Sequence, residues 1–470
     1  MSVFKSIFRN TTARTATEVV NRLGSALFWV FVIRYLSAFD LGAIAYGMAI
    51  YKLFNMISSL GLRPLFSKDV ARNRPKAGEY FSQILFLGSM AALFLWIAMV
   101  GLSFLHDSSG RVLRILSLTL FTGVGMHFGS AMLWAAEKLH WVTVAQTVRI
   151  FLLLTVGLIV FNSYQNAETV AWILAVSHIV SHLLCLVFAS VQVARPVAIL
   201  NRPVLYYYLQ QIPTFISITI AHSAYWTIPI VILTQIKGEQ ATGYFSAAHK
   251  LVDILVAVAL AYGQALLPIL SKFFKQTEKV HLIIGASLRY VSIITVAAAL
   301  LIYFSAPHII ASLFGPKMAP SAGVLRLLIW LILPYSMIPI LSQFLISHGR
   351  QKLDLIANLS GSITAISLSF LLIPLFAEKG LAVSMLAGAV ILGSVEWLSV
   401  RRTLDRFSLF EQIKFPLLGM VLMGLAMSGL GSSIPVLVIP GGVAVYVFFL
   451  MITGSLHELI GLIKRLLRQP

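Results

Sequence analysis

The sequence is poor in acidic residues and nearly devoid of cysteine. Its 470 residues include 16 Asp and Glu and a single cysteine, Cys185. One cysteine excludes a disulfide framework and a cysteine-based metal site within the chain. Charged residues of both signs make up only 11% of the sequence, whereas soluble domains carry about 25%. A soluble globular protein is therefore excluded, and the 59% hydrophobic content predicts an integral membrane protein.

Long polar stretches are also lacking. A membrane-spanning helix needs about 20 mostly apolar residues, and such runs recur along the whole chain. The connections between them are too short for a soluble domain, which argues against a membrane enzyme with a catalytic headpiece. Breaking the runs at charged or Pro-, Gly- and Asn-rich clusters predicts fourteen spans: 14–36, 41–63, 80–105, 112–135, 141–162, 168–191, 207–236, 241–270, 281–305, 321–346, 353–374, 379–400, 412–430 and 434–453.

The basic residues predict the orientation in the membrane. They outnumber the acidic ones by 35 to 16, a balance that would suggest nucleic-acid binding in a soluble protein. In a membrane protein, Lys and Arg instead hold loops on the cytoplasmic side. With a cytoplasmic N-terminus, the outside loops hold only Arg34, Arg111, Arg114, Lys237, Lys317 and Lys379. We therefore expect a multi-pass protein of the bacterial inner membrane with both termini in the cytoplasm, and no nucleic-acid partner.

A few basic residues remain inside predicted spans, where a charge costs roughly 2.5–3.5 kcal/mol at the helix centre. They are Arg22, Lys52, Arg149, Lys250, Arg289 and Arg326. The segment YGMAIYKLFN around Lys52 resembles YFSAAHKLVD around Lys250 at an offset of 198. This match predicts two parallel six-helix repeats with a substrate site between them near the membrane midplane. The predicted domains are 1–200 (helices 1–6), 201–405 (helices 7–12) and 406–470 (two additional helices and a cytoplasmic tail).

Three longer stretches resemble a known family. They are LSAFDLGAIAYGMAIYKLFNMISSLGLRPLFSKDVAR (Leu36–Arg72), GEQATGYFSAAHKLVDILVAVALAYGQALLPILSK (Gly238–Lys272) and LISHGRQKLDLIANLSGSITAISLSFLLIPLFAEKGLAVSML (Leu345–Leu386). Their turns, Tyr-bearing helices and basic loops are similar to those of bacterial polysaccharide-biosynthesis membrane proteins. These O-antigen-type flippases belong to the multidrug/oligosaccharidyl-lipid/polysaccharide (MOP) exporter superfamily.

The resemblance implies an all-α polytopic fold with two six-helix lobes in a V around a central cavity, plus two C-terminal helices. It also implies alternating access, without a cofactor and without catalysis. The expected cargo is an oligosaccharide on undecaprenyl pyrophosphate, moved to the periplasmic leaflet for O-antigen, capsule or exopolysaccharide synthesis. Membrane lipids and a glycan polymerase or other assembly proteins are the expected partners.

The sign of the buried charge favours an anionic cargo. A pyrophosphate carries about two negative charges, which Lys and Arg attract strongly in a low-dielectric cavity. We predict a cationic cavity formed by Lys52, Lys250, Arg22, Arg149 and Arg289. Glu18 and Asp253 are predicted to act in coupling or in ion pairs, because Glu18 lies four residues from Arg22 and Asp253 three from Lys250. For Arg149 and Arg289, an interhelical structural role is an equal alternative.

Two other functions stay open at this point. A cation-coupled multidrug or small-molecule exporter would share the architecture but needs acids in its cavity. A membrane glycan polymerase or ligase would also be polytopic, but such enzymes usually carry a large periplasmic loop, which this sequence lacks. His178 and His182 have the i, i+4 spacing of metal ligands, but no third ligand accompanies them, so no metal site is predicted.

Overall fold

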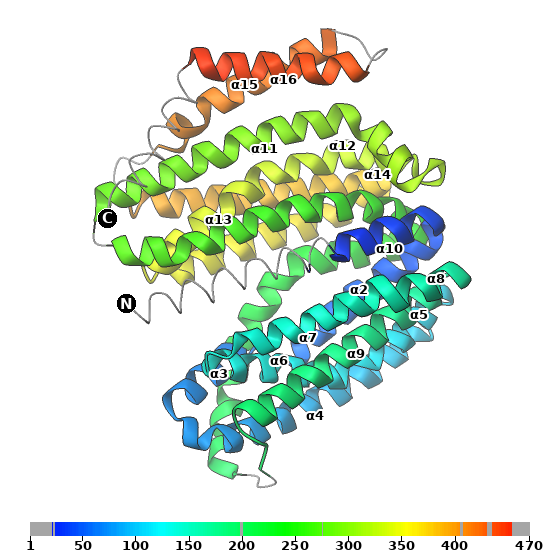
Figure 1. The fold of residues 1–470 in the computed structure, drawn as a ribbon, viewed down its shortest axis with the longest axis vertical. Helices are drawn as coiled ribbons and strands as arrows, with labels where there is room; N and C mark the ends of the chain where they lie inside the picture. Colours follow the sequence, from blue (N-terminus) through cyan, green and yellow to red (C-terminus); the bar gives the residue numbers. More distant parts are fainter. Residues whose placement is uncertain are drawn as a thin grey trace. The chain divides into compact units, whose positions relative to one another are not determined.

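The computed structural model describes residue 21 and residues 24–197, 201–274, 276–404, 408–429 and 435–453, and this part of the chain is helical, without strands (Figure 1). A first helix covers Gly24–Tyr35. The later helices are α2 (Ala38–Ser58), α3 (Arg63–Arg72), α4 (Ala77–Ser103), α5 (Ser108–Ser117), α6 (Thr119–Ala135), α7 (Leu139–Leu152), α8 (Leu158–Ser163), α9 (Ala167–Gln192), α10 (Arg202–Phe273), α11 (Thr277–Phe314), α12 (Ser321–Leu328), α13 (Ile332–Ser347), α14 (Gln351–Arg401), α15 (Leu409–Gly429) and α16 (Pro435–Ile452).

The predicted spans coincide with these helices wherever the chain is described. Eight of the described helices are long and apolar enough to cross a membrane, and the bent pair α5–α6 is a ninth. Two of the eight, α10 and α14, contain a backbone break and correspond to two predicted spans each. The helix Gly24–Tyr35, α2 and α16 correspond to the other three predicted spans. The prediction of an all-helical polytopic membrane protein with about fourteen spans is confirmed.

The two long helices break where the sequence predicts loops. In α10 the break is Gly238, with φ 81° and ψ 179°, a conformation that glycine adopts without a Cβ penalty. In α14 the break is Ala377, with φ 49° and ψ −128°, which is rare for a residue with a side chain. Each break therefore separates two predicted spans within what is nominally one helix.

The chain forms two compact units, residues 1–247 and 248–470. In unit 1, α6 packs against α9, α4 and α3, while α2 packs against α5 and α4. In unit 2, α13 packs against α14 and α11, and α11 also packs against α12 and α15. The two additional C-terminal helices α15 and α16 run side by side (Figure 1), and Tyr446 of α16 donates to the carbonyl oxygen of Ile293 over 3.0 Å.

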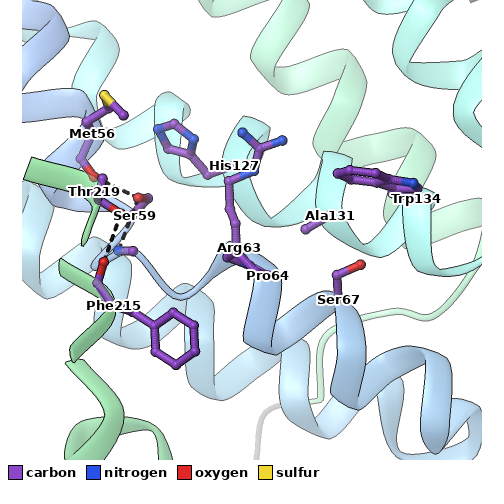
Figure 2. Close-up of a pocket in the computed structure, with 11 residues that line it drawn as sticks. Met56, Ser59, Arg63, Pro64, Ser67, His127, Ala131, Trp134, Phe215 and Thr219 are labelled. Carbon is purple, nitrogen blue, oxygen red and sulfur yellow. Dashed lines mark hydrogen bonds between the residues drawn. The ribbon is translucent and has the colours of Figure 1, made fainter. Parts of the chain in front are cut away.

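A strained break in unit 1 separates α2 from α3. Leu60 and Gly61 have φ values of 53° and 68°, and Leu60 is one of few residues with a side chain in this region. The Gly61 amide donates to Ser59 Oγ over 3.3 Å. A Cβ on Gly61 would overlap the carbonyl oxygen of Phe215 in α10, so only glycine fits this close approach. In Figure 2 the Phe215 backbone lies beside Ser59, and the Phe215 ring points away from it.

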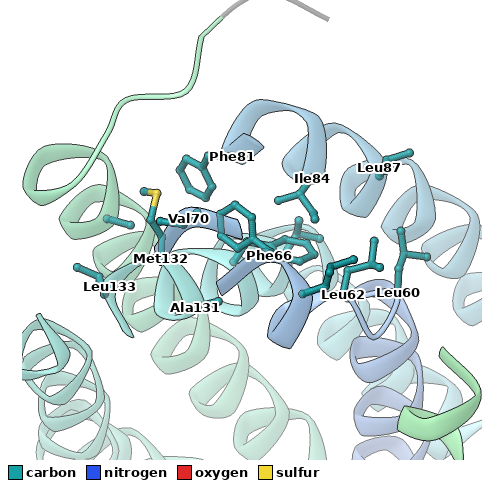
Figure 3. Packing of buried hydrophobic residues seen from close by; sticks show 14 of the residues in the cluster. Leu60, Leu62, Phe66, Val70, Phe81, Ile84, Leu87, Ala131, Met132 and Leu133 are labelled. Atoms are coloured by element: carbon teal, nitrogen blue, oxygen red, sulfur yellow. The ribbon is translucent and has the colours of Figure 1, made fainter. Parts of the chain in front are cut away.

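Aromatic packing holds α3 in place beyond this break. Phe66 of α3 is fully buried, stacks on Phe81 of α4 at a centroid distance of 6.0 Å, and meets Phe128 of α6 edge-on at 5.8 Å. Met132 and Leu133 of α6 complete the same core cluster (Figure 3). Burial of several large side chains, each contributing roughly 1.5–3 kcal/mol, offsets the strain at Leu60 and Gly61.

The backbone repeats at a constant offset over the second half of each predicted repeat. In unit 1, α6 ends at Ala135 and α7 begins at Leu139. In unit 2, α13 ends at Ser347 and α14 begins at Gln351, each 212 positions after its counterpart in unit 1. The turn in unit 1 is closed by bonds from Ala136, Glu137 and Lys138 to the carbonyls of Met132, Trp134 and Leu133. The turn in unit 2 is closed by bonds at the same offset, from His348, Gly349 and Arg350 to Phe344, Ile346 and Leu345. An internal duplication therefore includes these helices.

The same offset aligns an arginine in each unit. Val112–Leu116 reads VLRIL and Val324–Leu328 reads VLRLL. The Arg114 guanidinium lies 5.6 Å from the Phe104 ring centroid, and that of Arg326 lies 5.7 Å from the Tyr303 ring centroid. Phe104 directly follows the last residue of α4, whereas Tyr303 lies inside α11 and 199 positions later, so the arginines match at the offset of 212 but their aromatic partners do not.

Two glycines bring the backbones of α2 and α10 close together within unit 1. A Cβ on Gly42 of α2 would overlap the carbonyl oxygen of Glu239 in α10, and one on Gly243 would overlap that of Ala38. Only glycine therefore fits at these two positions without a shift of the neighbouring backbone.

The predicted equivalence of Lys52 and Lys250 at an offset of 198 stays a prediction. The two lysines lie in different units, Lys52 in unit 1 and Lys250 in unit 2.

Candidate functional site

Two predicted site residues, Lys52 and Arg149, lie near the same histidine in unit 1. Lys52 is exposed on α2, Arg149 is half-buried on α7, and both lie within electrostatic range of His178 on α9. The Tyr51 ring centroid is 6.0 Å from that of His178, and Arg149 Nε donates to Gln146 Oε1 over 3.0 Å. Neither Lys52 nor Arg149 forms an ion pair with a carboxylate of the described chain, so this pair of cations is not neutralised.

Further polar side chains extend this group through the unit. The ring centroids of His178 and His182 are 5.6 Å apart, and His182 Nδ1 lies 3.2 Å from Thr122 Oγ1. His127 on α6 lies within electrostatic range of His182, and its Nε2 is 2.9 Å from the carbonyl oxygen of Asn55. Each histidine has a hydrogen-bond partner within the protein, and no cluster of three His, Cys, Asp or Glu suited to a metal occurs in the described part of the chain.

A cavity of about 550 Å³ lies at the α2–α3 break, beyond His127. α2 and α3 line it together with His127, Ala131 and Trp134 of α6 and Phe215 and Thr219 of α10. Arg63, the first residue of α3, exposes its side chain here, and its Nη2 donates to Ser130 Oγ over 3.3 Å. In Figure 2 the Arg63 guanidinium lies between the His127 ring and Trp134. Sequence analysis missed Arg63, because it counted as an ordinary cytoplasmic loop residue.

The acid nearest to Arg63 along α3 is directed elsewhere. Asp69 Oδ2 accepts a hydrogen bond from the Tyr208 hydroxyl of α10 over 3.1 Å. Burial raises the pKa of Asp69, although Tyr208 and the neighbouring Lys68 and Arg72 oppose the shift. No Asp or Glu lines the cavity. The interior of unit 1 thus combines basic and neutral polar groups without a facing carboxylate in its described part.

The predicted residues of unit 2 have other surroundings. Asp253 Oδ2 lies 3.3 Å from His249 Nδ1, one turn away on α10, and Lys250 is half-buried beside them. Arg289 of α11 donates from Nη2 to Gln412 Oε1 of α15 over 3.3 Å, which links α11 to the first C-terminal helix. Glu18 and Arg22 lie outside the described residues. The roles predicted for these residues in cargo binding or coupling stay predictions.

Unit 2 contains a buried acidic pair that the sequence analysis missed. Asp354 at the start of α14 and Glu396 beyond its break face each other, and both are buried. Ser342 of α13 donates to Asp354 Oδ1 over 2.6 Å. Neither carboxyl oxygen of Glu396 has a hydrogen-bond partner in the described structure. Asp354 and Glu396 were not among the predicted site residues. Their positions near the same predicted side of adjacent spans were the available signal.

Sequence models of two families match the chain. The family described as Polysaccharide biosynthesis protein matches residues 7–274, more than half of the sequence, and the MatE family matches residues 213–371. No curated protein sequence matches.

Several solved transporters have a similar fold. A lipid II flippase MurJ in an inward closed conformation is 14% identical, with 95% of this chain and 99% of that chain covered and a TM-score of 0.77. An inward-facing multidrug resistance MATE family transporter of the MOP superfamily is 14% identical, with 82% and 94% covered and a TM-score of 0.65. A MOP superfamily transporter from Pyrococcus furiosus is 14% identical, with 84% and 95% covered and a TM-score of 0.57. These comparisons confirm the fold predicted from the resemblance.

Proposed function

Because the chain belongs to the polysaccharide biosynthesis protein family, and its fold places it among MOP-superfamily transporters, we propose that it moves a lipid-linked oligosaccharide between membrane leaflets. The cargo is a glycan on undecaprenyl pyrophosphate, carried from the cytoplasmic to the periplasmic leaflet of the bacterial inner membrane. It supplies the synthesis of O-antigen, capsule or exopolysaccharide. The protein makes and breaks no bond and needs no cofactor.

The observation that carries this proposal is the set of basic side chains of unit 1 that have no acidic partner. Lys52, Arg149 and Arg63 lie on three different helices, and none of them pairs with a carboxylate of the described chain. Lys52 and Arg63 are exposed and Arg149 is half-buried, so an anion can reach them. A pyrophosphate with about two negative charges is attracted by these cations, whereas a cationic drug is repelled by them.

The transport cycle follows from this electrostatic preference. The cations of unit 1 draw the pyrophosphate and its glycan away from the cytoplasmic surface, while the prenyl chain stays in the lipid. Alternating access of the two predicted lobes, 1–200 and 201–405, then exposes the headgroup to the periplasm. The segment 406–470 adds α15 and α16, which belong to unit 2 and pack against α11. Both termini are cytoplasmic in this scheme, as the basic loops predict.

Export of a cation is the second candidate, and the acidic pair of unit 2 favours it. Asp354 and Glu396 are buried carboxyls of the kind that bind a cation or a proton, and Asp354 lies within the segment that matches the MatE family, residues 213–371, whereas Glu396 lies outside it. Efflux of ethidium from proteoliposomes driven by a proton gradient would support this candidate. Its absence, together with glycan export, supports the flippase.

The proposal is tested in bacteria that depend on this chain for surface glycan. We expect K52A and R149A each to lower surface glycan and to raise lipid-linked precursor in the cytoplasmic leaflet, at unchanged protein level. K250A and R289A test the cavity residues predicted in unit 2. R111A is the matched control, because Arg111 pairs with Glu168 over 2.8 Å at an exposed site. Normal export by the double variant K52A/R149A would contradict the cationic mechanism.

A further inference from the structure

The cavity at the α2–α3 break is separate from the Lys52–Arg149 group and has its own cation. Its walls come from α2, α3, α6 and α10, all within unit 1. A volume of about 550 Å³ lies within the range of roughly 300–1,000 Å³ typical of small-molecule sites. Gly61 and Phe215 fix the approach of α10 to the break, so the packing of the chain forms the cavity before any ligand binds.

Arg63 offers more hydrogen-bond donors than the protein uses. A guanidinium has five N–H donors in a fixed fork, and the only bond to Arg63 within the described structure goes to Ser130 Oγ, at a long 3.3 Å. The other polar groups of the cavity wall are the hydroxyls of Ser59, Ser67 and Thr219 and the His127 ring. These groups are neutral or basic, so no carboxylate of the cavity wall competes with a ligand for the donors of the Arg63 guanidinium.

The backbone and the neighbouring charges add to the same field. Arg63 and Pro64 form the first turn of α3, a ten-residue helix whose N-terminus has no side-chain cap. The positive end of the helix dipole therefore faces the cavity, where it favours an anion. The only acid of α3, Asp69, is bonded to Tyr208 instead. Charge, fork geometry and helix direction thus select the same ligand class.

We propose that this cavity binds a phosphate-type anion, a phosphoryl or pyrophosphoryl group held by the Arg63 fork with help from Ser67 and the first turn of α3. Arg and phosphate oxygens match as bidentate partners. The half-exposed Trp134 gives the group attached to the phosphate an apolar face to lie on. The inference rests on the proposed function only for the source of the anion, which is the pyrophosphate of the cargo rather than a phospholipid headgroup.

Binding to the full-length protein in phosphatidylcholine nanodiscs tests the site directly. The probes are inorganic pyrophosphate, farnesyl pyrophosphate and uncharged farnesol, measured by isothermal titration calorimetry. We expect both pyrophosphates to bind and farnesol not to bind. R63A lowers the affinity for both by about tenfold or more, because it removes charge-assisted bonds. R63K, which keeps the charge but loses the fork, falls between wild type and R63A.

Two further variants distinguish binding at this cavity from binding to any exposed arginine and from a loss of binding caused by misfolding. R72A removes an exposed arginine from the last turn of the same helix, away from the cavity wall, and is expected to bind as wild type. S67W fills the cavity but keeps the guanidinium, and is expected to lose binding. If R63A fails to fold, the loss of binding in S67W tests the site instead. Equal affinity in wild type, R63A and S67W overturns the proposal.

Competition and export identify the source of the anion. Replacing part of the phosphatidylcholine with phosphatidylglycerol is expected to leave farnesyl pyrophosphate binding unchanged. If phosphatidylglycerol abolishes that binding in wild type, a phospholipid headgroup is the occupant and the assignment to cargo is wrong. If R63A loses binding while glycan export in cells is unchanged, the assignment to cargo is likewise wrong, and the flippase proposal stands on its own test with K52A and R149A.

Discussion

Unit 1 contains an open break, whereas unit 2 is closely packed around Tyr262 and Gly263. In unit 1 the chain breaks at Leu60 and Gly61 and leaves a cavity beside α6. The part of α10 that follows Gly238 continues without a further break to Phe273 in unit 2. There the Tyr262 hydroxyl donates to Ser287 Oγ over 3.0 Å, and Gly263 packs directly on Pro339 of α13. A break in the chain thus leaves a space that a continuous helix fills.

The two units also differ in the charge of the residues that bind two matching serines. Ser130 and Ser342 are equivalent in the 212-residue register. In unit 1 the serine accepts a bond from a cation, Arg63, and in unit 2 it donates to an acid, Asp354. A duplicated helix pair therefore carries basic chemistry in one unit and acidic chemistry in the other. The difference shows that the copies diverged in side chains while their backbone turns stayed the same.

Filling the open break is expected to have the largest effect. G61V places a β-branched residue at φ 68° and against the Phe215 carbonyl, which combines backbone strain with overpacking. We expect a loss of more than about 3 kcal/mol of stability, seen as a large drop in the thermal unfolding temperature in detergent. G101A is the control, since nothing lies within 4 Å of a Cβ there. Equal unfolding temperatures for G61V and G101A would contradict the close approach.

The two equivalent serines are expected to differ in importance. S342A leaves a buried carboxyl without its 2.6 Å donor and is expected to cost about 1–3 kcal/mol. S130A removes a 3.3 Å bond from an exposed arginine and is expected to cost less than about 1 kcal/mol. Thermal unfolding of the two variants side by side gives the order, and a larger loss in S130A would reverse the comparison.

The equivalent arginines are expected to behave alike. R114Q and R326Q each remove a cation–π contact of nearly the same length, 5.6 and 5.7 Å. Both arginines are exposed, so each substitution is expected to cost about 0.5–1 kcal/mol in unfolding measurements. A clear difference between the two variants would show that the duplicated contact no longer has the same structural role.

The smallest effect is expected at Glu396. Glu396 is fully buried and faces Asp354, and an amide of the same shape can donate a hydrogen bond to that neighbour. A neutral amide is therefore a close substitute, and E396Q is expected to change stability by less than about 0.5 kcal/mol. E396K is the comparison, because it introduces a buried cation. A strong destabilisation by E396Q would mean that the ionised carboxylate is needed.

Several features of the site were predictable because they depend on local sequence. Lys52 and Arg149 were singled out as charges within apolar spans, and the structure places both near His178. Arg63 was missed because its importance comes from the break before it and from α10, which returns about 150 residues later to line the same cavity. The pairing of Lys52 with Lys250 stays a prediction, because a short match between two apolar helices does not by itself define a contact between side chains.

The sequence by itself determined where the spans lie, that the chain is helical and which family it belongs to. The reason is that a membrane span is specified by apolar length, a property of consecutive residues. Only the tertiary structure decided the shared turn geometry at an offset of 212, the cavity with its unpaired Arg63, and the meeting of Asp354 with Glu396. Contacts between helices depend on which face and which height of each helix come together, and packing between distant segments fixes both.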